Sequence, residues 1–262
     1  MRKVYRSLNN DDYWNKRWKD AKEDKDYFEN LNIYPIKYSK KTIGDNKKSL
    51  ILEAGCGLGR ILKHHYNEGY NIVGMEYNAY CLEQIRKKYP KIRVIQADIR
   101  NLPFKDEEFD IILAFGLYHN LEEKDIDKAL KETRRCLKKG GKLCASVRAD
   151  NLETRLIDFI TYLRTRDKKQ NKFHKICFKP KEFSNILKKH GFLIKFVEVT
   201  ENVPFLFKFK IFRSKKLSKF DESIARSEGF KMNILGRVIQ KILRSLFPNS
   251  FGNTVVIICT KK

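Results

Sequence analysis

The first residues that could do chemistry are an acid and three glycines at short, regular spacing. Glu53 follows the apolar residues 50–52 and precedes glycines at alternate positions, Gly55, Gly57 and Gly59. Glycine permits positive φ and places no Cβ over the turn, so a ligand can approach the backbone closely. The carboxyl end of a buried strand is where open α/β sheets bind nucleotides. The pattern therefore predicts a strand, a tight turn and a helix that hold a nucleotide-like ligand.

Further apolar runs follow, each typical of a short buried strand. Residues 71–76 end in Glu76, a carboxylate suited to accept hydrogen bonds from both hydroxyls of a ribose. Residues 92–98 end in Asp98, residues 109–115 end in Phe115, and residues 138–147 lead on to Arg148. Because ligands bind outside the carboxyl ends of such strands, we expect these terminal side chains to lie near the glycine turn.

The order E-x-G-x-G-x-G that begins at Glu53 is not the dinucleotide-binding pattern, because its third glycine, Gly59, comes one residue early. It resembles motif I of the class I S-adenosylmethionine-dependent methyltransferases of type 11 or 25, and the further runs follow in that family's order. The resemblance implies an enzyme that transfers a methyl group from its cofactor, S-adenosyl-L-methionine. It also implies a Rossmann-like α/β fold, a seven-stranded sheet with an antiparallel last strand, helices on both faces, and an insertion before that strand.

The same resemblance assigns roles to single residues. It implies that Glu76 binds the ribose hydroxyls and that Asp98 receives the adenine amino group. The residues expected to bind the cofactor are Glu53, Gly55, Cys56, Gly57, Gly59, Glu76, Tyr77, Asp98, Ile99 and Phe115.

Candidate acceptor-side residues follow the fourth and fifth runs. His119 is a candidate general base, because imidazole accepts protons near neutral pH, but related methyltransferases also use a histidine here as a wall of the cofactor pocket. Arg148 could hold a carboxylate or phosphate of the acceptor. His174 is a second candidate base, with a surface position as its alternative. Residues 115–120 lack the N/D-P-P-Y and Pro-Cys motifs, which argues against methylation of DNA bases.

The length of 262 residues fits a single domain, residues 1–262, with 42% hydrophobic residues to form its core. We expect an N-terminal cap over residues 1–48, a cofactor-binding core over 49–147 and an acceptor-side half over 148–262. The cap carries Tyr13, Trp14 and Trp18 at helical spacing. These rings either fold over the cofactor, as the resemblance implies, or fasten the helix to the sheet edge. A second cap helix is expected to break at Pro35 before an exposed loop.

Other helices are expected at residues 78–89, 121–137 and 181–190, with strands at 192–199 and 254–260. Glycines 140 and 141 are the expected stop of the second helix.

A basic insertion at about residues 200–250 most distinguishes the chain. Residues 203–212 alternate phenylalanine with lysine, which is typical of a strand. Residues 234–247 predict a helix with an apolar stripe and with Arg237, Lys241 and Arg244 on its opposite face. Such a helix either packs its stripe into the core or docks on an anionic membrane.

The charge of +24 is concentrated in residues 161–195 and 201–250. It fits either a lysine-rich solvated surface or a polyanionic or membrane-surface partner. The six cysteines form no C-x-x-C pair, so we expect reduced core residues and no metal site. No apolar run reaches the roughly 18 residues of a membrane span, which predicts a cytoplasmic protein, either free or peripheral to a membrane.

Three functions remain open from the sequence. The first is methyl transfer to a small-molecule acceptor or to one linked to a lipid or glycan, which the Phe-rich segment and the basic amphipathic helix favour. The second is methylation of RNA or protein through the basic face, although no appended RNA-binding module is recognisable. The third is binding of S-adenosylmethionine without catalysis, which the intact motif set disfavours.

Overall fold

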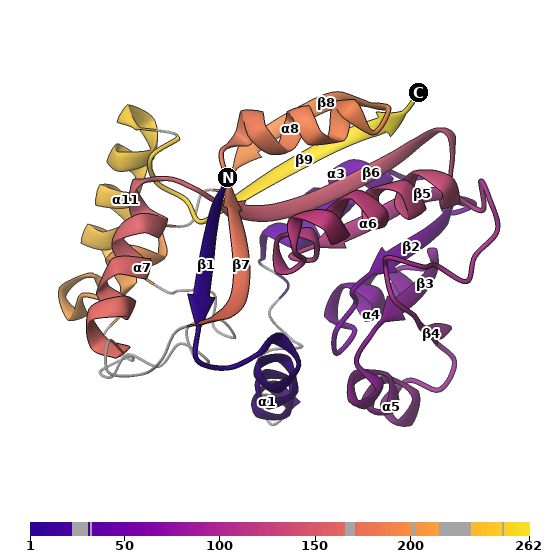
Figure 1. The fold of residues 1–262 in the computed structure, drawn as a ribbon, viewed down its shortest axis with the longest axis horizontal. Helices are drawn as coiled ribbons and strands as arrows, with labels where there is room; N and C mark the ends of the chain where they lie inside the picture. Colours follow the sequence, from indigo (N-terminus) through magenta and orange to yellow (C-terminus); the bar gives the residue numbers. More distant parts are fainter. Residues whose placement is uncertain (23–30, 32, 166–170, 201–202, 215–231, 248) are drawn as a thin grey trace.

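The structure is a computed structural model of residues 1–262 and describes all of them except 23–30, 32, 166–170, 201–202, 215–231 and 248 (Figure 1). The strands are β1 (Arg2–Arg6), β2 (Leu50–Ala54), β3 (Asn71–Glu76), β4 (Val94–Gln96), β5 (Phe109–Phe115), β6 (Leu137–Ala149), β7 (Lys172–Phe178), β8 (Phe192–Val199) and β9 (Thr254–Lys261). The α-helices are α1 (Asn10–Lys22), α3 (Tyr34–Ile43), α4 (Arg60–Asn67), α5 (Ala79–Lys88), α6 (Glu123–Cys136), α7 (Leu152–Thr165), α8 (Pro180–Lys189), α9 (Pro204–Phe207) and α11 (Ile234–Leu246), with 3-10 turns η1 (Tyr118–Asn120) and η2 (Lys210–Phe212).

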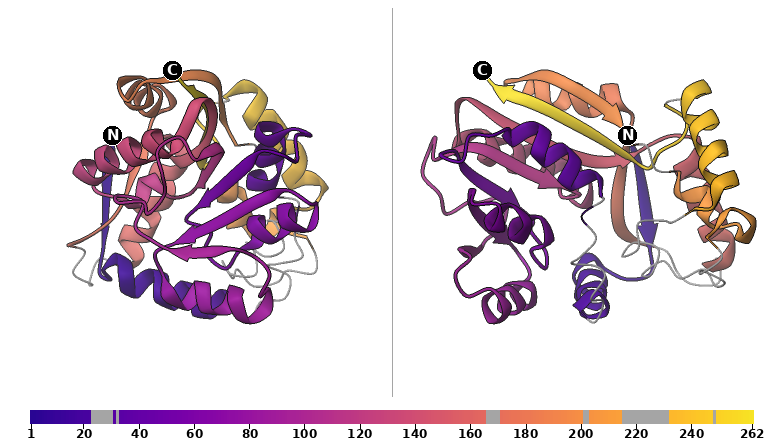
Figure 2. Two further views of the ribbon diagram at one scale, coloured as in Figure 1. Left: turned by 90° about the vertical axis from the view of Figure 1, so that its right-hand side faces the viewer. Right: turned by 180° about the vertical axis from the view of Figure 1, so that it is seen from behind.

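Seven strands form the predicted doubly wound sheet. Strands β4, β3, β2, β5 and β6 lie side by side and parallel, and β9 pairs antiparallel with both β6 and β8. Strands β2 and β5 consist mostly of consecutive apolar residues, because helices cover both faces of the sheet. Side chains of α6 and α8 pack on one face, and those of α3, α4 and α5 on the other (Figures 1 and 2). This architecture confirms the predicted fold class.

Two further strands, β1 and β7, were not predicted. They pair antiparallel along their whole length, and β7 joins the sheet only through Arg148–Cys177 and Ala149–Phe178. The pair therefore diverges from the sheet beyond the end of β6, toward α1 (Figure 1). Residues 172–178 were expected only as a lead-in to the next helix.

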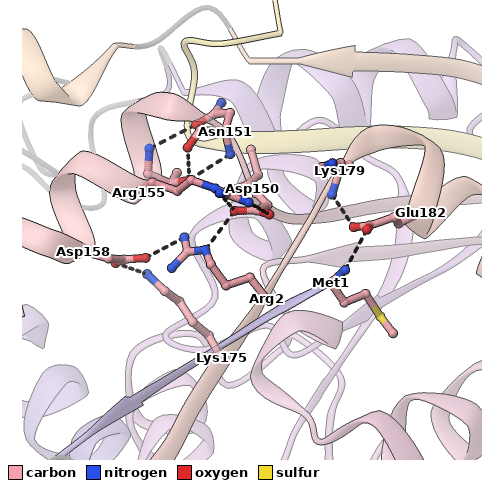
Figure 3. A network of polar contacts seen from close by, with 11 residues as sticks. Met1, Arg2, Asp150, Asn151, Arg155, Asp158, Lys175, Lys179 and Glu182 are labelled. Carbon is pink, nitrogen blue, oxygen red and sulfur yellow. Dashed lines mark hydrogen bonds and ion pairs between the residues drawn. The ribbon is translucent and has the colours of Figure 1, made fainter.

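Ion pairs fix β1 against α7 (Figure 3). The Arg2 guanidinium binds Asp150 and Asp158, each at 2.8 Å. Arg155 binds the other oxygen of Asp150 at 2.9 Å, and Lys175 of β7 binds Asp158 at 3.1 Å. Because Asp150 is buried, it keeps its charge only beside these cations, and its location makes it a structural residue.

Other local expectations are corrected by the structure. Pro35 occupies the first turn of α3, as its fixed φ favours, while the segment expected to form a helix before it lies mostly outside the described residues. Helix α6 ends at Cys136 and passes directly into β6, so glycines 140 and 141 lie within the strand. Residues 203–212 form the short helix α9 and the turn η2, not a strand. All six cysteines are free and buried, as expected of core residues.

Candidate cofactor and acceptor site

The glycine turn between β2 and α4 has the geometry that its sequence predicts. Gly55, Gly57 and Gly59 have φ of +74°, +54° and +79°. A Cβ built on Gly57 would lie 2.6 Å from Cη2 of Trp18, and one built on Gly59 would lie 3.0 Å from Ile85. These positions therefore require glycine both for the backbone conformation and for the space above the turn.

Glu76 closes the turn from the end of β3. One carboxylate oxygen accepts from the Gly57 N–H at 2.8 Å, and the other accepts from the N–H groups of Tyr77 and Asn78 at 2.9 and 3.0 Å. Burial raises the pKa of Glu76, and these three hydrogen bonds oppose that rise. The residue is thus placed where the resemblance expects a ribose ligand, while the Tyr77 side chain is exposed.

Glu53 lies beneath the same turn and is only 3% exposed. Burial raises its pKa to about 8, with the nearby Glu76 adding to the rise against a hydrogen bond from the Leu62 backbone. Oε2 of Glu53 has no hydrogen-bond partner within the described residues. A buried carboxyl that is neutral at pH 7 and keeps one oxygen unpartnered can accept a hydrogen bond from a ligand.

Asp98 lies at the end of β4, beside the buried Ile99. Its carboxylate accepts hydrogen bonds from Arg100, with Nη2 at 2.6 Å, and Arg100 also binds Asp125 at 3.0 Å. Although burial opposes it, the Arg100 guanidinium holds the pKa of Asp98 below its usual value. Arg100 was not predicted from the sequence, in which its only signal is a cation two residues after the acid.

Helix α1 crosses the mouth of the turn. Trp14 and Trp18 stack with their ring centroids 5.5 Å apart, and Trp18 lies against Gly57. Asn15 of the same helix accepts a hydrogen bond from Asn78 Nδ2 at 2.6 Å. Both expectations for this cap find contacts: Trp18 and Asn15 reach the turn and the end of β3, whereas Tyr13 lies 5.3 Å from the ring of His174 on the outer strand β7.

The acceptor side begins where β5 and β6 end. Phe115 lies 6.2 Å from the Tyr34 ring, whose hydroxyl is 3.2 Å from Ser146 Oγ. His119 is 9% exposed, and its Nδ1 has no partner within the described residues. Burial, followed by the positive charge of Arg148 and Lys175, lowers the pKa of His119 well below its ordinary value.

His174 of β7 belongs to the same region. Its ring lies 5.3 Å from that of Tyr13, over which the Arg6 guanidinium sits at 3.7 Å. Burial, followed by the positive charges of Arg6 and Lys175, lowers the pKa of His174 to about 3. Both histidines are therefore neutral at pH 7 and hold a proton weakly, which disfavours either as a strong general base.

Arg148 is half-buried at the end of β6. Its charge acts on both His119 and His174. Throughout the described ranges, the Arg148 guanidinium forms no ion pair or hydrogen bond, unlike Lys175, which is neutralised by Asp158. The structure thus brings the three acceptor-side candidates into one electropositive region.

Elsewhere on the molecule, Asp106, Glu107, Lys131, Arg134, Arg135 and Lys261 line a hollow of about 560 Å³. It lies at the amino-terminal edge of β5, opposite the glycine turn, and Arg135 and Lys261 within it are already paired with Asp106 and Glu107. Among the described residues, no cluster of metal-ligating side chains is found. No described helix is long and apolar enough to cross a membrane.

The residues around the turn fit S-adenosylmethionine. The glycines give the turn its positive φ, Glu53 has an unpartnered buried oxygen, Glu76 ends β3, and Asp98 follows the end of β4. Comparison with known proteins agrees with this fit. Residues 52–145 match a family model described as a methyltransferase domain.

Individual relatives share part of the chain. An uncharacterized protein of Methanocaldococcus jannaschii is 33% identical over 120 residues, which are 46% of this chain and 48% of that protein. The probable tRNA methyltransferase 9B of Mus musculus is 33% identical over 119 residues, 45% of this chain and 26% of that protein. This chain thus spans less than half the length of these curated relatives. The solved structure of an S-adenosylmethionine-dependent methyltransferase from Methanosarcina mazei has a similar fold, with a TM-score of 0.59 at 18% identity. The match covers 88% of this chain and 99% of that one.

Proposed function

From the class I S-adenosylmethionine-dependent methyltransferase domain that this chain contains, we propose that the protein methylates a small molecule or a lipid- or glycan-linked acceptor that carries an anionic group. The observation that carries the proposal is Arg148. Its guanidinium lies half-buried at the end of β6 without a partner in the described structure, beside His119 and His174. An acceptor carboxylate or phosphate would neutralise it through two parallel hydrogen bonds.

The residues around the glycine turn would hold the cofactor. Glu76 would accept from the ribose hydroxyls, Asp98 from the adenine amino group, and Glu53, through its unpartnered oxygen, from another donor group of the ligand. When bound, S-adenosylmethionine supplies a methyl group on an activated sulfonium. The protein's main contribution is then alignment of the acceptor, which can lower a barrier by roughly 7–11 kcal/mol in well-oriented systems.

The acceptor-side histidines would position the reacting hydroxyl or amine of the acceptor, whose proton passes to solvent on methyl transfer. His119 and His174 are neutral at pH 7, so each can accept one hydrogen bond and donate another. Trp18 and the rest of α1 exclude water from the turn.

The test starts from purified protein, methyl-tritiated S-adenosylmethionine and extract of the host cell. Label that enters organic solvent, or a small aqueous product that binds an anion exchanger, supports the proposal. Arg148→Gln should then raise the KM for the acceptor at least about tenfold, as expected when a charged hydrogen bond is lost, and leave cofactor affinity unchanged. Arg155→Gln is the matched control, since Arg155 is exposed and bound to Asp150.

A second candidate is RNA methylation, favoured by the relative named as a tRNA methyltransferase and by the charge of +24. In that case the label becomes nuclease-sensitive and binding weakens steeply with salt. Protease-sensitive label would instead point to a protein acceptor. Tight cofactor binding without label in any fraction would contradict catalysis altogether.

A further inference from the structure

Helix α11 is packed with its apolar stripe outward. Ile234 is 73% exposed and Leu246 is 66% exposed, whereas Gly236 is buried. A Cβ built on Gly236 would lie 2.7 Å from the Phe212 carbonyl oxygen, so the helix backbone lies close against η2 on that side. The side that a helix normally buries is therefore the side that α11 leaves in solvent.

Polar side chains hold the inward face of the helix. Gln240 accepts a hydrogen bond from the Val203 N–H at 3.2 Å. Arg244 donates to the carbonyl oxygens of Val199 and Phe251, each at 2.7 Å. Arg244 is thus not on a wet face, as the sequence suggested, and the core-packing explanation of the apolar stripe is wrong.

The exposed stripe continues onto η2. Asn233 joins the two elements, since its Nδ2 donates to the Ile211 carbonyl at 2.6 Å and its N–H to that of Phe212. Ile211 is 65% exposed. We call the resulting set of at least about 40% exposed apolar side chains the α11 surface: Phe209, Ile211, Ile234, Leu235, Val238, Ile242, Leu246 and Phe247.

Within the described residues, the charged side chains that α11 and η2 place beside the α11 surface are positive. At 100° per residue, Lys241 and Arg237 lie next to Ile234 at one border of the stripe, and both are exposed. Lys210 is exposed on η2. Residues 203–214 and 232–247 contain no aspartate or glutamate.

We propose that the α11 surface docks on an anionic lipid bilayer. An amphipathic helix binds in the interface plane when its apolar face enters the acyl boundary and its cations meet lipid phosphates. A second copy of this chain would bring the same positive charges together, which disfavours a self-complementary interface. A nucleic acid would satisfy the cations but would leave the apolar side chains in water.

The location of α11 suits such docking. Helices α11 and α7 lie at the same end of the molecule, away from α4, α5 and the glycine turn (Figures 1 and 2). Phe159, Tyr162 and Leu163 of α7 are also more than half exposed. A bilayer bound at this end would leave the turn accessible to the cofactor.

The test is co-sedimentation of the full chain with vesicles of phosphatidylcholine alone or with one quarter phosphatidylglycerol. We expect binding to the anionic vesicles that is at least tenfold tighter than to the neutral ones. The triple variant Ile234→Ser, Val238→Ser, Ile242→Ser should lose at least tenfold of that affinity. Leu193→Ser with Val197→Ser, at exposed apolar positions of β8, is the matched control and should bind as the unchanged chain does.

A charge test separates the two contributions. Arg237→Glu with Lys241→Glu should abolish the preference for anionic vesicles, whereas Lys188→Glu with Lys189→Glu on exposed positions of α8 should retain it. Circular dichroism and calorimetric cofactor binding, which involves none of these residues, check that each variant folds.

Several results would overturn the proposal. Equal binding to both vesicle types, or an equal loss of affinity in both control variants, would show that nonspecific electrostatic or hydrophobic attraction causes the binding. A dimer that the triple variant dissociates, measured by sedimentation velocity without lipid, would assign the surface to a second copy. Tighter binding to host RNA than to vesicles would assign its cations to nucleic acid. None of these results depends on whether the acceptor itself is a lipid.

Discussion

The Arg100 guanidinium binds the carboxylate of Asp98. Its Nε lies 3.0 Å from Oδ1 and 2.9 Å from Oδ2, and its Nη2 lies 2.6 Å from Oδ2. The Arg100 backbone N–H also donates to Oδ1 at 2.8 Å, and Asp125 holds the far side of the guanidinium. These contacts fix the direction of the carboxylate at the end of β4. Asp98 is therefore oriented before any ligand arrives.

We expect Asp98→Ala to weaken S-adenosylmethionine binding by about tenfold or more, because a hydrogen bond to a charged group contributes roughly 1.5–3 kcal/mol. Arg100→Ala should weaken it less, since it removes the support and leaves the carboxylate. Isothermal titration calorimetry on both variants measures the difference. Equal losses of affinity in the two variants would mean that Asp98 and Arg100 act as one unit and that Asp98 makes no separate contact with the ligand.

The glycine turn supplies a second prediction. Gly57→Ala should lower the free energy of unfolding by about 1–2 kcal/mol through its positive φ, and should also weaken cofactor binding because the new Cβ meets Trp18. Gly140→Ala is the control, since Gly140 has φ of +75° but open space around it. Chemical denaturation should find both variants destabilised, and calorimetry should find cofactor binding changed only for Gly57→Ala.

We expect Glu53 to make the free energy of unfolding depend on pH. Its pKa of about 8 lies above the ordinary 4.5, so between these values the folded chain keeps a proton that the unfolded chain has lost. The contribution of Glu53 to the free energy of unfolding is therefore complete below pH 4.5. Above that pH it falls by up to about 1.4 kcal/mol per pH unit, until about pH 8.

Urea denaturation between pH 5 and 8 can isolate this effect. Glu53→Gln removes the titration and keeps the shape of the side chain, so its stability should decline less over this range than that of the unchanged chain. Parallel pH profiles for the two proteins would place the pKa of Glu53 near its ordinary value and refute a neutral carboxyl beneath the turn.

We expect His174 to make the free energy of unfolding fall at acidic pH, which is the opposite of the trend expected from Glu53. Its pKa of about 3 lies below the ordinary 6.5, so the unfolded chain binds a proton that the folded chain does not. The stability that depends on the neutral ring is present above pH 6.5 and is lost as the pH falls toward 3. His174→Gln should reduce this acid sensitivity, which thermal unfolding between pH 4 and 7 measures. An unchanged acid profile would mean that the ring is solvated.

The residues of the cofactor turn were predictable because each ends or follows a buried apolar run. Glu53, Glu76 and Asp98 occupy strand ends whose order follows from the sequence. Arg100 was missed because its partner is set by rotamers at a loop, not by periodicity. The alternation of Phe205, Phe207 and Phe209 predicted a strand, but Pro204 starts a helical turn there.

The orientation of α11 could not be predicted from the sequence, for a different reason. A hydrophobic stripe gives the amphipathic character of a helix but not which side meets the protein. The inward side was decided by Gly236, Gln240 and Arg244, whose partners Phe212, Val203 and Phe251 lie on other segments of the chain. Strands β1 and β7 were missed because charged residues interrupt their alternation.

The chain has two tryptophans, and both lie on the part of α1 that crosses the glycine turn. All intrinsic tryptophan fluorescence of the molecule therefore originates beside the glycine turn. Its emission is a label-free optical probe of that one place, and titration of the unmodified protein can follow ligand binding there without interference from the rest of the fold.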